Sequence, residues 1–193
     1  MAEREDWDIW RVDYNDGKWA EPTNLGEPIN TSGPEFYPSI SSNGNLYFTA
    51  TRDEGMGSED IYRAIFDEGR YTHVENIGGG VNTGTVEFNA FIAPDESYLI
   101  FGSQRREGEI GGGDLYISKN KNGSFQKASM LNADINSKRL DYCPYVFRGR
   151  FYFTSERATP VKGPVDYSTL SRSFTSPGNG LGDIYSVPFE DIN

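Results

Sequence analysis

The chain has 193 residues, a net charge of −11, 22 glycines, 12 Phe, 12 Tyr and 3 Trp. So acidic a chain cannot neutralise phosphate groups, which argues against nucleic-acid binding and against docking on anionic lipid. The single histidine excludes most histidine-based mechanisms, and the single cysteine excludes an internal disulfide. No stretch approaches the roughly 18 apolar residues of a membrane span.

Three short motifs recur along the chain at intervals of roughly 50 residues, the range of repeat architectures. The first is Asp-aliphatic-aromatic, at residues 8–10, 60–62, 114–116 and 183–185. The second is aliphatic-Asn-Thr/Ser, at 29–31, 81–83 and 135–137. The third is an aromatic residue followed closely by arginine, as in Phe48 and Arg52, Phe101 and Arg105, and Phe153 and Arg157. All three keep one register, so we predict that copies of a single unit build the chain.

In chain order, residues 6–31 are expected to supply only the third and fourth strands of a unit, joined at Asn15-Asp16-Gly17. Residues 35–83 and 87–137 are expected to form complete units, and 141–190 the first three strands of a last one. Because the chain begins within a unit, we expect that it is a fragment of a larger protein whose upstream sequence, with any secretion signal, is missing. The alternative is awkward closure into four units.

The first complete unit shows what is built. Its runs 37–41, 46–50, 61–66 and 71–76 are rich in aromatic and β-branched residues, which favours strands. Asn43-Gly44 and Asp67-Glu68-Gly69 supply the positive φ of tight hairpin turns. A four-stranded antiparallel meander cannot bury both faces alone, so we predict an all-β fold in which the units pack radially as blades of a β-propeller. No segment shows sustained helical periodicity.

An insertion, residues 158–180, interrupts the last unit and is rich in Ser, Thr, Pro and Gly. Long segments of this kind inside compact domains are usually either functional or disordered. We predict that its basic and aromatic residues bind a partner: Lys162, Tyr167, Arg172 and Phe174. A mobile surface loop without a binding role is the alternative.

The recurring charged residues suggest two further features. The arginines end second strands and the aspartates begin third strands, so a structural Arg–Asp clasp is predicted in each unit, because the guanidinium binds a carboxylate bidentately: Arg52 with Asp60, Arg105 with Asp114, and Arg157 with Asp183. Acids before the innermost strands are expected at one mouth of a central channel, as a candidate cation site that would suit calcium: Glu35, Glu87 and Asp141. The favoured alternative is that each acid caps a turn or is a second partner of the same arginine.

The units resemble the TolB-type, WD-repeat-like β-propeller repeat of bacteria. The residues that carry the resemblance are Glu35, Pro38, Gly44, Leu46-Tyr47-Phe48, Arg52, Asp60-Ile61-Tyr62 and Trp19 through Thr31. It covers essentially the whole chain apart from the insertion and the first few residues, although Ala90 stands where the repeat has proline. The resemblance implies a periplasmic or envelope-associated propeller used for protein contacts. Such repeats also occur as non-catalytic domains of some peptidases.

From these observations we expect a non-enzymatic binding or scaffold module with no catalytic residues and no cofactor, calcium being the one candidate. Its partner is expected to be a protein of the bacterial envelope, without nucleic acid and without membrane insertion, and unpaired edge strands would allow a homodimer. The competing interpretation is a hydrolase-type propeller, lactonase- or sialidase-like, with a cation or acidic cluster in its channel. A cytoplasmic location is the alternative to the envelope.

Overall fold

The computed structural model describes residues 6–161, 163 and 166–192 of the chain. The fold is all-β with one short α-helix in this part, and every strand pair is antiparallel. The first complete sheet has the order β5 (Glu35–Ile40), β6 (Leu46–Ala50), β7 (Asp60–Asp67) and β8 (Arg70–Asn76). These are the four strands predicted for the first complete unit, so that prediction is confirmed.

The second complete sheet repeats this order with β9 (Val86–Ile92), β10 (Tyr98–Gln104) and β11 (Asp114–Lys121). Its fourth position is divided between two short strands, β12 (Ser124–Phe125) and β13 (Ser129–Met130), which both pair with β11. The last sheet has three strands, β14 (Asp141–Phe147), β15 (Arg150–Ser155) and β16 (Asp183–Pro188), and a 3₁₀ helix, η1 (Phe189–Ile192), follows it.

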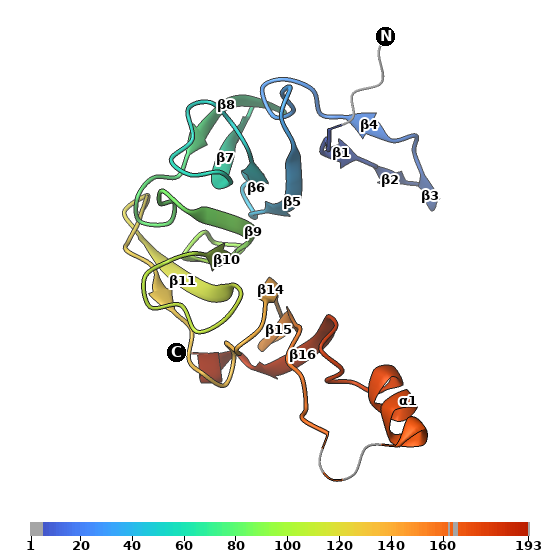
Figure 1. The fold of residues 1–193 in the computed structure, drawn as a ribbon. Coiled ribbons are helices and arrows are strands. Elements are labelled where there is room, and N and C mark those ends of the chain that lie inside the picture. The colour runs from blue at the N-terminus through green and yellow to red at the C-terminus, as the bar shows by residue number, and fades with distance from the viewer. Residues whose placement is uncertain (1–5, 162, 164–165, 193) are drawn as a thin grey trace.

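The N-terminal strands are short and exposed. β1 (Trp10–Arg11) pairs with β4 (Thr23–Asn24), and β2 (Tyr14–Asn15) forms a hairpin with β3 (Lys18–Trp19). The sheets follow one another along an open arc, with the blue N-terminal strands and the red C-terminal sheet at opposite ends (Figure 1). The sheets therefore do not close into a ring of four units, which was the alternative interpretation of the sequence.

The core lies between successive sheets. One apolar cluster joins the two complete sheets, with Tyr47, Ile61 and Phe101 all fully buried in it. A second cluster joins the sheet of β9–β13 to the last sheet, where Phe151 and Phe153 pack with Ile192 of η1. Burying these faces against each other removes apolar surface from water, which is the main force that holds such sheets together.

The first strands of the three larger sheets, β5, β9 and β14, lie on the inside of the arc (Figure 1), and each carries a bulge at an equivalent position. The bulged residues have φ values of 51°, 53° and 51°, at Tyr37, Asn89 and Cys143 respectively. Their side chains meet: the Asn89 amide donates to Cys143 Sγ at 3.1 Å, and the Tyr37 hydroxyl donates to the Pro144 carbonyl at 3.4 Å. Cys143 is therefore half-buried and hydrogen-bonded.

The insertion contains a helix, α1 (Tyr167–Thr175), where the sequence predicted only a loop. Ser and Thr are weak helix formers and hide the pattern, but Asp166 caps the first turn by accepting from Thr169 N–H at 2.7 Å. The base of the insertion is closed by the bridge between Ala158 and Asn179. The helix stands away from the sheets (Figure 1). Within the described residues, no helix is long and apolar enough to cross a membrane.

Candidate functional site

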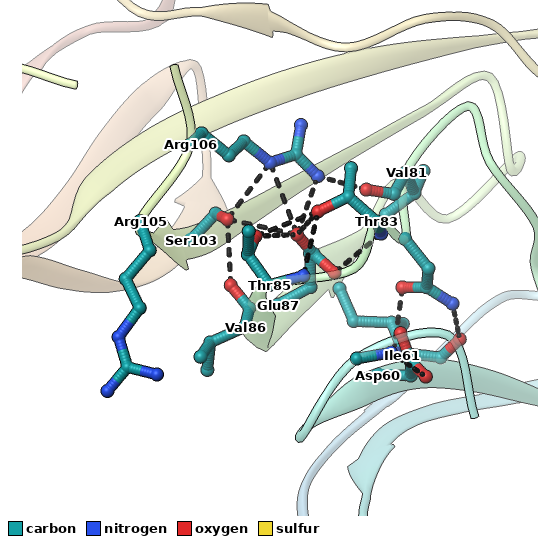
Figure 2. Close-up of polar contacts among 12 residues, drawn as sticks. Asp60, Ile61, Val81, Thr83, Thr85, Val86, Glu87, Ser103, Arg105 and Arg106 are labelled. Carbon is teal, nitrogen blue, oxygen red and sulfur yellow. Dashed lines mark hydrogen bonds and ion pairs between the residues drawn. The ribbon is translucent and has the colours of Figure 1, made fainter. Parts of the chain in front are cut away.

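The recurring polar residues gather at the junctions between successive sheets. At the central junction the carboxylate of Glu87, fully buried at the start of β9, accepts hydrogen bonds from Thr83 N–H at 2.8 Å and Thr83 Oγ1 at 2.7 Å (Figure 2). Ser103 Oγ adds a third at 3.1 Å. The acid therefore caps the turn that leads into its own strand, as the favoured alternative predicted.

Arg106 is the cationic partner of this acid, with Nη2 at 3.0 Å from Glu87 Oε1. Its guanidinium lies 5.1 Å from the ring centre of Phe101 and 4.8 Å from that of Tyr116, and it also donates to the Val81 carbonyl. Figure 2 shows Arg106 reaching over Glu87 while its neighbour Arg105 points away. Planar stacking, charge and hydrogen bonding together suit arginine and not lysine.

A buried asparagine ties the same junction to the preceding sheet. Asn82 Oδ1 accepts from Ile61 N–H at 2.9 Å, and its Nδ2 donates to the Ile61 carbonyl at 2.8 Å, so that one side chain pairs with the backbone as a strand would. The backbone of Glu87 adds a bond to the Glu59 carbonyl at 2.9 Å. The sequence marked this asparagine as recurrent, but gave it no role.

The other two junctions repeat this arrangement. The asparagine contacts are Asn30 with Ile9 and Asn136 with Leu115. The ion pairs are Arg52 with Glu35 at 3.7 Å and Arg157 with Asp141 at 3.4 Å. Each arginine again lies over one aromatic ring from the second strand and one from the third: Phe48 and Tyr62, or Phe153 and Tyr185. The recurring motifs are therefore one interlocking device, which we call the junction lock: an acid, its arginine and the asparagine.

The predicted Arg–Asp clasps are wrong. Among the described residues, no ion pair joins Arg52 to Asp60, Arg105 to Asp114, or Arg157 to Asp183. Each aspartate instead accepts backbone N–H groups of the loop before its own strand: Met56 to Asp60 at 2.5 Å, Ile110 to Asp114 at 2.5 Å, and Gly178 to Asp183 at 2.6 Å. These loops leave N–H groups without a ladder partner, and a carboxylate satisfies them.

The predicted register also fails at one arginine. This unit has one extra residue between its aromatic residue and the arginine that forms the ion pair. That residue is Arg105, which has φ +65° and an exposed side chain. Arg106 therefore occupies the position that Arg52 and Arg157 hold in the other units. Equal spacing in the sequence could not reveal an inserted residue when two arginines stand side by side.

The acids predicted to line the mouth of a channel form separate ion pairs instead. Glu35, Glu87 and Asp141 are each buried and bound to a different arginine. No three Asp, Glu, His or Cys side chains in the described part of the chain are placed to share an ion. The candidate cation site, as a single group of these three acids, is therefore not formed.

Each junction brings two carboxylates near one another. Burial raises the pKa of Asp60, and the adjacent Glu87 raises it further. Burial likewise raises the pKa of Asp114, with Asp141 as its neighbour, and that of Glu35, with Asp8 as its neighbour. The charged forms of these groups are therefore disfavoured in the folded protein.

We expect the free energy of unfolding to rise as the pH is lowered from neutral toward the unfolded pKa of these carboxyls, about 4. A carboxyl whose pKa is higher in the folded than in the unfolded state takes up a proton on folding, so stability falls as pH rises from its unfolded pKa, about 4, through its folded one. Asp95 and Asp166, whose pKa is lowered by hydrogen bonds, titrate below this window. Urea midpoints at pH 5, 6 and 7 measure the effect.

The matched variants are Asp60→Asn, which removes one of the buried carboxyls, and Asp67→Asn, which changes an exposed one. The first is expected to flatten the pH dependence and the second to leave it unchanged. A midpoint that rises steadily from pH 5 to 7 would contradict the assignment.

The predicted partner-binding residues fall on α1, apart from Lys162, which lies outside the described residues. Tyr167 and Phe174 are 87% and 70% exposed, and Leu170, which the sequence analysis missed, is 43% exposed. Their spacing places all three on one face of the helix. Arg172 lies on another face, beside a hollow of about 360 Å³ lined by Pro160, Val161 and other residues of the insertion.

No family model and no curated protein matches this chain.

Proposed function

We propose that the chain is part of a β-propeller of the TolB-type repeat family and acts as a non-enzymatic binding module that contacts a protein partner through α1. Successive four-stranded meanders with their first strands on the inside of an arc support the comparison with propeller blades (Figure 1). The envelope location rests on the resemblance of the repeats alone.

The observation that carries the proposal is the apolar face of α1, formed by Tyr167, Leu170 and Phe174. A helix on a globular domain normally turns such a face toward the core, yet no residue of α1 is buried. Exposed aromatic residues at this spacing are the anchors with which a helix enters an apolar groove of a partner. A protein groove is therefore the surface that this helix fits.

The recurring charged residues give the hydrolase-type alternative little support. General acid–base chemistry needs carboxylates in different environments at one accessible place. Here each acid of a junction lock is buried and bound to its own arginine. The charges that looked like a site from the sequence are those that join the sheets.

Replacing Tyr167, Leu170 and Phe174 together by Ser is expected to abolish partner capture without changing the fold. Because none of the three is buried, we expect the free energy of unfolding to stay within about 0.5 kcal/mol of the wild type. The measurement is quantitative mass spectrometry of proteins retained from bacterial envelope extract by the immobilised chain.

The matched control replaces three exposed aromatic residues of the N-terminal strands, Trp10, Tyr14 and Trp19, by Ser. This control is expected to retain the same partner as the wild type. Equal retention by the α1 variant, or no protein retained by the wild type above bare resin, would overturn the proposal.

A further inference from the structure

The junction lock includes a backbone socket that is filled three times in this chain. The socket is the N–H and C=O of the aliphatic residue in the recurring Asp-aliphatic-aromatic motif: Ile9, Ile61 and Leu115. An asparagine side-chain amide occupies each socket, and the exposed fractions of Ile9, Ile61 and Leu115 are 5%, 0% and 0%. The N–H of the residue directly after β4, β8 or β13 also donates to the same carbonyl: Leu25 at 3.2 Å, Ile77 at 3.3 Å and Leu131 at 2.9 Å.

Ile184 holds the same position in β16 but is 80% exposed. Its neighbours are arranged as in the filled copies: Asp183 accepts from the preceding loop at Gly178, and Arg157 lies 4.7 Å from the ring centre of Tyr185. In the part of the chain that the structure describes, no strand pairs with the outer edge of β16. The fourth socket is thus built and uncovered.

The ladder register shows which way this socket faces. Ile61 stands opposite Thr49, and its N–H and C=O turn away from that strand toward Asn82. Ile184 stands opposite Thr154 in the equivalent pair. Alternate residues of an antiparallel strand turn their backbone groups to opposite sides, so the Ile184 groups face the open edge.

We propose that the open edge of β16 is a docking site for an extended peptide segment. The segment has an aliphatic residue and, five positions later, an asparagine followed by Thr or Ser. The occupant is inferred from the three filled sockets, where Leu25 precedes Asn30, Ile77 precedes Asn82, and Leu131 precedes Asn136. The site is separate from α1 and does not depend on it.

The rest of the edge limits pairing to the socket. Pro188 has no N–H to offer at the far end of β16, and the Arg150 side chain covers the Ser186 carbonyl at 3.1 Å. Such features protect an edge strand against indiscriminate pairing. Recognition is left to the Ile184 backbone and the asparagine amide, which makes the docking selective.

The test uses a fluorescent synthetic peptide with the sequence of residues 70–83, which contains one complete occupant, and the full chain. Fluorescence anisotropy is expected to show saturable binding. A peptide with Asn82→Ala loses two backbone contacts and is expected to bind at least about tenfold more weakly. A scrambled peptide of the same composition is the control.

On the protein, Ile184→Pro removes the socket N–H and is expected to abolish binding, while Ile184→Val is expected to retain it. Because a proline can disturb the strand, hydrogen exchange gives a second measurement: the peptide should slow exchange at the Ile184 amide and leave the already bonded Ile61 and Leu115 amides unchanged. Absence of saturable binding, equal binding of the Asn82→Ala peptide, or no protection at Ile184 would overturn the proposal.

Discussion

Replacing Arg106 by Met is expected to lower the free energy of unfolding by about 3 kcal/mol or more. Among the described residues, the Arg106 guanidinium is the one cation bound to Glu87, which is fully buried. Removing one partner of a buried ion pair leaves an uncompensated charge. The variant also loses the stacking on Phe101 and Tyr116. Equilibrium denaturation in urea, followed by circular dichroism, measures the difference.

The adjacent residue provides the control for this result. Arg105 is exposed and forms no ion pair within the described chain, so Arg105→Met is expected to change stability by less than about 0.5 kcal/mol. Equal losses from the two substitutions would show that Glu87 does not depend on Arg106.

Replacing Asn82 by Ala is expected to cost about 2 kcal/mol of unfolding free energy. The N–H of the fully buried Ile61 would lose its partner, while the Ile61 carbonyl would keep only the Ile77 N–H at 3.3 Å. An unsatisfied buried group costs roughly 1–3 kcal/mol. Asn15→Ala, in the exposed N-terminal hairpin, is expected to have little effect. The same urea titration compares both, and a loss below about 1 kcal/mol for Asn82→Ala would contradict a locking role.

Strand positions could be predicted because strand composition and turn chemistry agree in this sequence. Gly44 and Gly69 have φ +92° and +84°, and both end tight turns between predicted strands. Local rules suffice for such elements, since a hairpin places its own two strands side by side. The same agreement makes β5 to β8 predictable to within a residue or two.

The partners of the recurring charges could not be predicted, because they depend on groups that composition does not show. From the sequence, Arg52 could pair with either Glu35 or Asp60. In the structure Asp60 accepts hydrogen bonds from N–H groups of the loop before β7, and Arg52 pairs with Glu35. Similarly, the role of Asn82 requires the Ile61 backbone, which lies in the preceding sheet.

The helix α1 was missed for another reason. Its residues are mainly Ser and Thr, and its apolar positions make no core contact that a periodic pattern would reveal. Its start depends on a single cap, Asp166, whose role can be recognised only once the following residues are known to be helical. The exposed face that results is the basis for the proposed protein contact.

We propose that the recurring acids and arginines join the sheets and that recognition is left to α1 and the edge of β16. A pair of double-mutant cycles tests it most directly, one with Glu87→Gln and Arg106→Met, the other with Asp114→Asn and Arg105→Met. We predict a coupling energy above about 1 kcal/mol for the first pair and one close to zero for the second. The reverse result, strong coupling between Asp114 and Arg105 and none between Glu87 and Arg106, would contradict this assignment.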